Sequence, residues 1–469
     1  MKFRIAPFAL FSAALAAQPG ATGIDPTKPP ETPPIPNYRL PPISESKLPN
    51  GLTLVLVEDA RFPMVTAQLN FQAGSKFDPA DAPGLADAVA ALLTEGTPTR
   101  TSRQISEEVD ALGATLRARA DADALTLGGD TLSENLPRFL ALMADAARNA
   151  SFPVDEVNLY KQNRAQALRA EHADAATLAR ERFTAVVYGV TPYGHILPTE
   201  ASIAKLDQKA LAAFHDRHLT PNTATLILIG KLPGRAELHK LIAERFGSWP
   251  RKPAPAAPAI APPAPERRIV LVDRPGSVQA NILAGRLAPV RTSPEYFPLA
   301  VGMTVLGGGA NSRMFRDIRE KQGFAYDAHA EYNTNREGAS VAAVTQVRNA
   351  VIEPAMKAVL AELDGMATAP VPDKELDGTK NYLAGTFLLH LETQSGVAMQ
   401  LNRVRTLGLP DSYLETFTAR VRAVEPAQIL EAAKKYLTPG QAAIVVVGDA
   451  SKIGDALKKF GTVTVAKAE

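Results

Sequence analysis

The chain contains no cysteine. Disulfide bonds, thiolate nucleophiles and cysteine-ligated metals are therefore excluded. Lysine and arginine total 51 against 49 aspartates and glutamates, so the sequence also lacks the positive excess that typifies proteins binding nucleic acid or anionic membranes. We expect partners of neutral or mixed charge and no nucleic acid.

The chain also lacks an apolar run long enough to cross a bilayer, which takes about 20 residues. The apolar run at residues 5–15 is shorter, follows Lys2 and Arg4, and ends in Ala14-Leu15-Ala16. This order is typical of a secretory signal peptide, so residues 1–17 are predicted to be removed and the mature protein to be periplasmic or secreted. A retained membrane anchor is the alternative, whereas a lipoprotein is excluded because no cysteine follows the run.

Two proline-rich stretches divide the chain. A length of 469 residues is too great for one ordinary core. Residues 18–37 predict an extended leader, and the Pro/Ala-rich residues 251–266 predict a linker. The expected domains are therefore residues 38–250 and 267–469.

The two predicted domains look like divergent copies of each other. Each opens with two apolar strands and a helix, and each closes on a strand that ends in glycine, followed by a final helix. Helical spacing of apolar residues also occurs between these ends, as at residues 376–391. The fold class predicted is α+β, with two homologous domains, each a mainly antiparallel sheet with helices on one face. The matching strands are 52–57 with 269–273, 64–71 with 278–283, and 225–230 with 443–448.

The segment at residues 84–97 reads G-L-A-D-A-V-A-A-L-L-T-E-G-T. It resembles the active-site helix of the insulinase/pitrilysin zinc peptidases, G-L-A-H-x-x-E-H-x-L-x-x-G-T, in which two histidines bind zinc and the glutamate activates water. Those three positions hold Asp87, Ala90 and Ala91. The family's further zinc-binding glutamate falls near residues 163–168, which contain no carboxylate. We predict no metal and no cofactor in this chain.

A second segment, residues 306–326, reads L-G-G-G-A-N-S-R-M-F-R-D-I-R-E-K-Q-G-F-A-Y. It resembles the same family's other signature, whose arginine and tyrosine hold the substrate carbonyl near the scissile bond. The resemblance assigns these roles to Arg319 and Tyr326, which are both donors able to stabilise developing oxyanion charge. The resemblance also favours a tight turn at Gly307, Gly308 and Gly309 that approaches bound peptide. A phosphate loop is the alternative, but the following Lys-Ser/Thr is missing.

Two histidine-containing segments are weaker candidates. His215 and His218 have a spacing compatible with one metal, but they fall within residues 214–222, which match a structural segment of the family, and nothing nearby supplies a third ligand. Glu171 and His172 lie at a polar helix end, where a solvated face is expected.

The resemblance implies a clamshell of two domains enclosing a chamber, with zinc on one wall and the Arg/Tyr pair on the other. A chain with only the second half of this equipment is predicted to be the non-catalytic, substrate-binding subunit of a heterodimeric zinc metallopeptidase. It would be inactive alone, and its partner would be an H-x-x-E-H homologue holding the zinc. Sheet edges would bind extended peptides with broad specificity.

Two other interpretations remain open. The first is a structural or peptide-binding scaffold with no part in proteolysis, as some relatives are scaffold subunits of larger assemblies. The second, ranked last, is an autonomous hydrolase in which Asp87 helps form an unconventional metal site.

Overall fold

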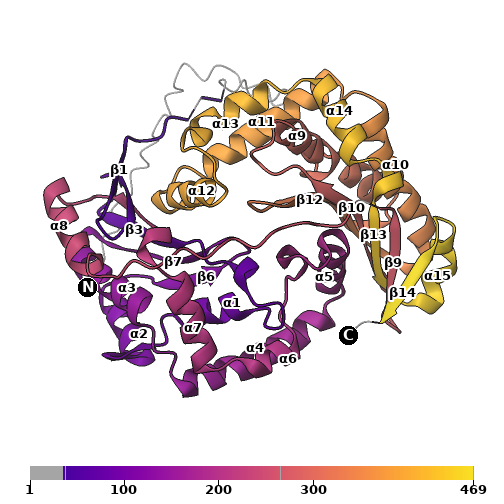
Figure 1. The fold of residues 1–469 in the computed structure, drawn as a ribbon. Coiled ribbons are helices and arrows are strands. Elements are labelled where there is room, and N and C mark those ends of the chain that lie inside the picture. Colours follow the sequence, from indigo (N-terminus) through magenta and orange to yellow (C-terminus); the bar gives the residue numbers. More distant parts are fainter. Residues whose placement is uncertain (1–34, 37, 265, 468–469) are drawn as a thin grey trace, which may run out of the picture. The chain divides into compact units, whose positions relative to one another are not determined.

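Two six-stranded sheets organise the chain in the computed structural model, which describes residues 35–36, 38–264 and 266–467 (Figure 1). The predicted signal peptide and most of the predicted leader lie outside these residues. Residues 37–469 form one compact unit. The predicted linker contains no helix or strand in its described part, residues 251–264 and 266.

The N-terminal sheet is antiparallel except between β2 and β8. Its order is β1 (Ile43–Lys47), β2 (Thr53–Glu58), β8 (Ala224–Gly230), β3 (Met64–Phe71), β7 (Leu125–Leu132) and β6 (Arg117–Ala120). A separate hairpin pairs β4 (Gly96–Thr97) with β5 (Arg100–Thr101).

The C-terminal sheet is antiparallel except for β9, which runs parallel to both β13 and β14. Its order is β11 (Ala325–Thr334), β12 (Ala339–Arg348), β10 (Gln279–Ala288), β13 (Ala443–Gly448), β9 (Arg268–Asp273) and β14 (Val463–Lys467). The α+β prediction, with two similar halves and mainly antiparallel sheets, is confirmed.

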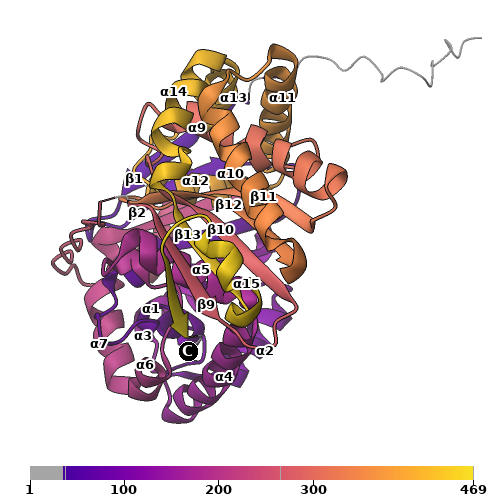
Figure 2. The same ribbon diagram turned by 90° about the vertical axis from the view of Figure 1, so that its right-hand side faces the viewer.

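Helices of each half pack on that half's own sheet, as α1 and α3 do in the first and α10, α14 and α15 in the second (Figures 1 and 2). The predicted helix at residues 376–391 corresponds to α11. The N-terminal helices are α1 (Leu85–Leu92), α2 (Ser102–Ala111), α3 (Leu136–Asn149), α4 (Val154–Ala173), α5 (Ala175–Tyr188), α6 (Glu200–Lys205), α7 (Gln208–His218) and α8 (Arg235–Phe246). The C-terminal helices are α9 (Tyr296–Gly307), α10 (Ile352–Thr368), α11 (Asp373–Leu389), α12 (Gln394–Thr406), α13 (Ser412–Arg422), α14 (Pro426–Tyr436) and α15 (Ala450–Lys458). A π-helix, η5 (Phe315–Lys321), and short 3₁₀ turns complete the set: η1 (Ser75–Phe77), η2 (Ser133–Asn135), η3 (Pro192–Gly194), η4 (Pro221–Thr223), η6 (Asn349–Val351) and η7 (Pro439–Gln441).

Each half contributes one helix to the sheet of the other half. The prediction placed helices on only one face of each sheet and did not include this exchange. Helix α12 packs on β3 and β8 of the N-terminal sheet, and α5 packs on β10 and β13 of the C-terminal sheet. Because successive side chains of a strand face opposite sides, a strand covered on both faces is apolar throughout. On β2, Leu54 joins the N-terminal core, whereas Val55 joins the core that contains α12. The exchanged helices thus bind the halves together.

A buried ionic cluster also joins the halves. Lys76 Nζ lies 3.0 Å from Asp123 Oδ1 and 2.9 Å from Glu337 Oε2, and Lys76 and Asp123 are only 4% and 5% exposed. Tyr193 Oη lies 2.6 Å from Asp123 Oδ1 and 2.8 Å from Glu337 Oε2, and Arg336 N–H donates to Asp123 Oδ2 at 2.8 Å. Since Arg336 and Glu337 form the turn between β11 and β12, the cluster fixes that hairpin to the N-terminal half.

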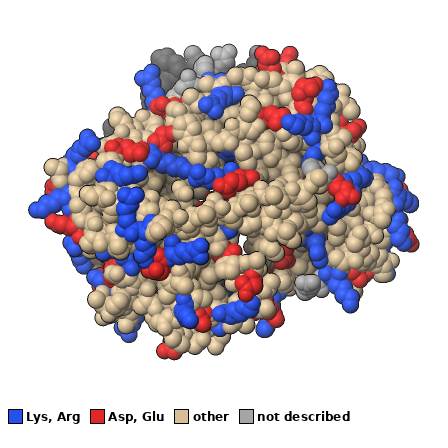
Figure 3. All heavy atoms as spheres, in the orientation of Figure 1, with Lys and Arg blue, Asp and Glu red and all other residues tan. Residues whose placement is uncertain are grey.

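The visible surface is electrostatically mixed. Figure 3 shows blue and red side chains interspersed over one face of the molecule, in keeping with the balanced composition. None of the described helices is long and apolar enough to span a membrane.

Candidate functional site

Helix α1 carries the segment that resembles a peptidase active-site helix. Gly84, at φ 91°, begins it in a left-handed conformation that favours glycine. The backbone N–H groups of Gly84 and Ala86 both donate to the Asp78 carboxylate at 2.8 Å, so Asp78 caps the helix from a distance in sequence. Burial raises the pKa of Asp78 to about 7, and the two backbone hydrogen bonds oppose that rise.

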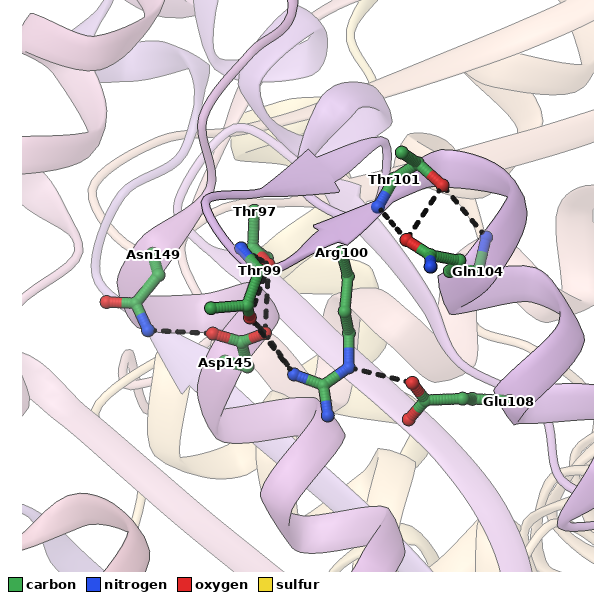
Figure 4. A network of polar contacts seen from close by, with 8 residues as sticks. All are labelled: Thr97, Thr99, Arg100, Thr101, Gln104, Glu108, Asp145 and Asn149. Carbon is green, nitrogen blue, oxygen red and sulfur yellow. Dashed lines mark hydrogen bonds and ion pairs between the residues drawn. The ribbon is translucent and has the colours of Figure 1, made fainter.

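Gly96 and Thr97, which end the motif, make contacts that stabilise the fold. Gly96, at φ 145°, opens the β4–β5 hairpin, and Thr97 donates to Asp145 Oδ2 at 2.9 Å (Figure 4). Arg100 Nη1 donates to the same Asp145 oxygen at 2.7 Å, and its Nε donates to Glu108 at 3.0 Å. The network holds α2 and α3 to the hairpin directly after α1.

The three positions that lack the motif's metal ligands and glutamate, Asp87, Ala90 and Ala91, all lie on α1, as predicted. Asp87 and Ala91 are exposed, and Ala90 is 3% exposed. The protein surrounding Asp87 raises the pKa of its carboxyl, chiefly by desolvation and then by the nearby Asp121 and Glu171, while Arg164 lowers it.

Arg164 brings a positive charge close to Asp87. It extends from α4, lies near enough to Asp87 to affect its pKa, and donates to Glu171 Oε2 at 2.9 Å. A guanidinium cannot ligate a cation and repels it. Among the described residues, no group of three or more histidines, cysteines, aspartates or glutamates could hold a metal ion. These residues therefore do not fit zinc.

The chain alone should retain well under one zinc per molecule after dialysis against zinc and then buffer, measured by atomic emission. The variant Asp87→His/Ala91→His should still bind zinc weakly, since it has two ligands beside an arginine. Adding Arg164→Glu supplies a third ligand and should let zinc survive dialysis. Stoichiometric zinc in the natural chain, lost in Asp87→Ala, would contradict this account.

Arg319 and Tyr326 are brought together although they lie on different elements. Arg319 is on the π-helix η5, whose end is marked by Gly323 at φ 62°, and Tyr326 lies at the start of β11. The Arg319 guanidinium lies 5.0 Å from the centre of the Tyr326 ring and 4.4 Å from that of Phe315. These cation–π contacts orient the arginine.

The polar ends of this pair are free. Tyr326 is 86% exposed, and within the described part of the chain neither its hydroxyl nor the Arg319 side chain makes a hydrogen bond or an ion pair. Both groups can therefore donate to a ligand without breaking an internal bond. No hydrogen bond, ion pair or ring contact among the described residues links them to Asp87, Ala90 or Ala91.

The three glycines differ in their surroundings. A Cβ on Gly307 would lie 2.1 Å from the backbone nitrogen of Ala330, and one on Gly308 would lie 2.5 Å from Thr304 Cγ2, so both are needed for packing within the chain. A Cβ on Gly309 would make only ordinary contact, 3.6 Å from Tyr382 Oη. Gly308 and Gly309 both line a hollow of about 690 Å³ between this turn and α11. Of the three, Gly309 is best placed to approach a ligand.

Strand β11 carries a charged cluster directly after Tyr326. His329 Nδ1 lies 2.6 Å from Asp327 Oδ2, and its Nε2 lies 3.3 Å from Glu331 Oε1, to which Arg180 of α5 donates at 2.7 Å. The hydrogen bond with Glu331 and the charge of Asp327 raise the pKa of His329. The hydrogen bond with His329, followed by that with Arg180, lowers the pKa of Glu331 to about 2.

The stabilisation from this cluster should be greatest between about pH 4.5 and 6.5. Glu331, with an ordinary pKa of 4.5, contributes stability above that pH and loses it as the pH falls toward 2. His329, with an ordinary pKa of 6.5, contributes below that pH and loses it as the pH rises through its raised value. Denaturant unfolding should therefore separate His329→Gln from the natural chain more at pH 5.5 than at pH 9. A pH-independent difference would show that the charge of His329 is not involved.

The remaining histidines make packing contacts. His215 Nε2 lies 2.9 Å from the Ala147 carbonyl oxygen, and the ring of His218 stacks on Phe214 at 4.4 Å. Burial lowers the pKa of His218 to about 4. Glu171 and His172 differ from the expected solvated face: both are half-buried, because Glu171 pairs with Arg164 and His172 Nε2 lies 3.4 Å from Glu181.

Sequence reasoning found the Arg/Tyr pair and the degenerate α1 positions but missed Arg164 and Asp78. An arginine in a polar helix and an aspartate before a turn carry no sequence signal for such roles, which arise only when α4 and the preceding loop pack beside α1.

Fold and site together define a peptidase-like protein of two similar halves. Residues 53–198 match the family described as insulinase (peptidase family M16), and residues 205–383 match the domain described as the peptidase M16 inactive domain. The chain belongs to the insulinase family, peptidase family M16.

Named relatives agree with this assignment. The chain is 25% identical over 367 residues to an uncharacterised zinc protease of Mycobacterium leprae, covering 77% of this chain and 82% of that one. It is 23% identical over 423 residues to a probable mitochondrial-processing peptidase subunit beta of Arabidopsis thaliana, covering 87% and 78%. A solved peptidase M16 inactive domain from Pseudomonas fluorescens superposes with a TM-score of 0.81 at 26% identity, covering 87% of this chain and 98% of that one.

Proposed function

We propose that this chain is the non-catalytic, substrate-binding subunit of a heterodimeric zinc metallopeptidase. The observation that carries the proposal is the contrast between two parts of one molecule: α1 presents Asp87 and alanines beside Arg164, whereas Arg319 and Tyr326 are oriented with free donors. Such a chain cannot activate water but can hold a substrate carbonyl. It would complement a partner that has the zinc and the water-activating glutamate.

The partner is an H-x-x-E-H homologue that holds the zinc, and Arg319 and Tyr326 act across the interface on its substrate. One relative is named as a subunit of a processing peptidase, which supports an assembly of unlike chains. The complex hydrolyses peptide bonds, and sheet edges hold the substrate in extended form. The residues at 1–17, with their signal-peptide pattern, support function in the periplasm or outside the cell.

The test is to mix this chain with a homologue that carries the H-x-x-E-H motif and to assay a mixed peptide pool by mass spectrometry. We expect cleavage by the mixture, little by the homologue alone and none by this chain alone. Co-elution of the two chains in size-exclusion chromatography should accompany the activity. Co-elution without any gain in cleavage would overturn the proposal and favour a scaffold that takes no part in proteolysis.

A further inference from the structure

A large hollow lies beside the glycine turn and does not include the Arg/Tyr pair. Its volume of about 690 Å³ is within the range of small-molecule sites, and it lies between residues 308–312 and the first part of α11. Helix α9, which leads into the turn, packs against α11 (Figure 1). Neither Arg319 nor Tyr326 lines the hollow, so a ligand other than the peptide can be considered for it.

The wall formed by the turn carries hydrogen-bond donors that have no partner within the described chain. The backbone N–H groups of Gly309, Ala310 and Asn311 make no hydrogen bond with a described residue. Ser312 also lines the hollow, is only 5% exposed, and has a hydroxyl without a described partner. Buried hydroxyls are normally hydrogen-bonded, and successive free N–H groups in a turn form a concavity that binds anions. This wall therefore suits a ligand with several acceptor oxygens.

Positive charge in the hollow exceeds negative charge. Arg316 and Lys374 line it, are exposed, and make no hydrogen bond or ion pair with a described residue. Glu375 lines it too, but Arg313 neutralises this carboxylate by donating to it from Nε at 3.0 Å and from Nη2 at 2.8 Å. The other carboxylates of η5 and of the first part of α11 do not line the hollow: Asp317, Glu320, Asp373 and Asp377. Two positive charges are thus left for a ligand.

The rest of the lining suits an organic group. Val305 and Pro372 contribute apolar surface, and Tyr382, which is 52% exposed, contributes its ring. The Tyr382 hydroxyl lies close to Gly309 and makes no hydrogen bond with a described residue. A ligand with an anionic end and an apolar or aromatic end would therefore match both parts of the hollow.

We propose that this hollow binds a small organic phosphate monoester. A phosphate carries a charge of about −2 at pH 7 and three strong acceptor oxygens, which match two free cations and the donors of the turn. A carboxylate has one charge and two oxygens and would leave part of this set unused. The organic group packs on Val305, Pro372 and the Tyr382 ring.

The structure also supplies what the sequence lacked for a phosphate site. No lysine and serine or threonine directly follow the three glycines, but Lys374, from a distant helix, and Ser312 line the same hollow as Gly308 and Gly309. This inference goes beyond the proposed function and does not depend on it.

The test is isothermal titration calorimetry of the full chain with phenyl phosphate and with benzenesulfonate, which has a similar shape but only one negative charge. We expect phenyl phosphate to bind about three- to tenfold more tightly, because the second charge has a free cation to meet. This preference should disappear as the pH falls below about 6, where the phosphate loses its second charge.

Three variants assign the binding to the hollow. Arg316→Gln and Lys374→Gln should each weaken phenyl phosphate binding by about three- to fivefold. Lys380→Gln is the matched control, because Lys380 lies on the same helix as Lys374, does not line the hollow and makes no ion pair within the described chain. It should leave the affinity unchanged within about 1.5-fold.

Chemical labelling locates the ligand independently. Bound phenyl phosphate should slow the modification of Arg316 by phenylglyoxal, read by mass spectrometry, and should not slow that of the exposed Arg348 on β12. Equal slowing at both residues would place the ligand elsewhere and refute the site.

Two further results would overturn the proposal. Equal affinities for phenyl phosphate and benzenesulfonate would refute the phosphate assignment, and an absence of binding at about 1 mM would refute the site altogether. Neither result would bear on the proposed subunit function, because Arg319 and Tyr326 lie outside the hollow.

Discussion

Replacing Arg319 with alanine should lower the kcat of the mixed peptidase complex by about 100- to 1,000-fold. The guanidinium is held over the Tyr326 ring with its donors free, so under the proposed function its loss would remove a pre-oriented hydrogen-bond donor from the oxyanion. Tyr326→Phe, which deletes only the hydroxyl, should also lower kcat by about 100-fold, again because one donor is lost. Both effects should appear in kcat more than in KM, since the bonds strengthen as charge develops.

The control is Arg348→Ala, an exposed arginine at the end of β12 that makes no ion pair within the described chain. It changes the charge equally and should leave kcat nearly unchanged. Co-elution of each variant with the partner and an unchanged thermal midpoint would show that assembly is intact. Arg319→Ala retaining kcat within about threefold would place the pair outside the chemistry, since a lost oxyanion donor costs far more.

Lys76→Met should destabilise the chain by about 3–5 kcal/mol. The substitution roughly preserves the volume of the side chain but leaves the carboxylate of Asp123, 5% exposed, without its countercharge. Tyr193 and the N–H of Arg336 still donate to Asp123, but neither supplies a full positive charge. Denaturant unfolding of the full chain measures the effect.

Two variants make this prediction specific. Lys205→Met breaks an exposed ion pair with Asp81, in which the side chains are 57% and 75% exposed, and should cost less than about 1 kcal/mol. Lys76→Met/Asp123→Asn removes both buried charges and should recover part of the lost stability. A cost below about 1 kcal/mol for Lys76→Met would show that the cluster contributes little, because an unpaired buried charge is far more expensive.

The architecture followed from the sequence because each half repeats the same local pattern. Strands such as β2, β8 and β13 were recognisable as apolar runs that end at a glycine or a charged residue. The exchange of α5 and α12 was not predictable, because an amphipathic pattern shows that a helix buries one side and does not show against which sheet. The strands that are apolar throughout were the sequence signal that both faces of each sheet are covered.

The candidate site also has features that the sequence predicted and features that it could not predict. The spacing of Arg319 and Tyr326 could be seen in the sequence, but their stacking depends on a π-helix that no local propensity predicts. Arg164 could not be assigned a role, because its effect on Asp87 requires α4 and α1 to lie together. Gly307 and Gly308 were predicted to approach bound peptide, and the structure adds a packing reason for glycine at both positions, because backbone atoms of β11 and α9 lie too close for any side chain.

The most direct measurement is a titration of this chain into a fixed amount of the H-x-x-E-H homologue, with the initial rate of peptide hydrolysis recorded at each ratio. The account predicts a rate that rises with added chain, breaks at one chain per homologue, and stays at the baseline when the Arg319→Ala/Tyr326→Phe variant is added instead. A homologue that is fully active alone, or a rise that is the same with the variant, would contradict a subunit that completes the active site.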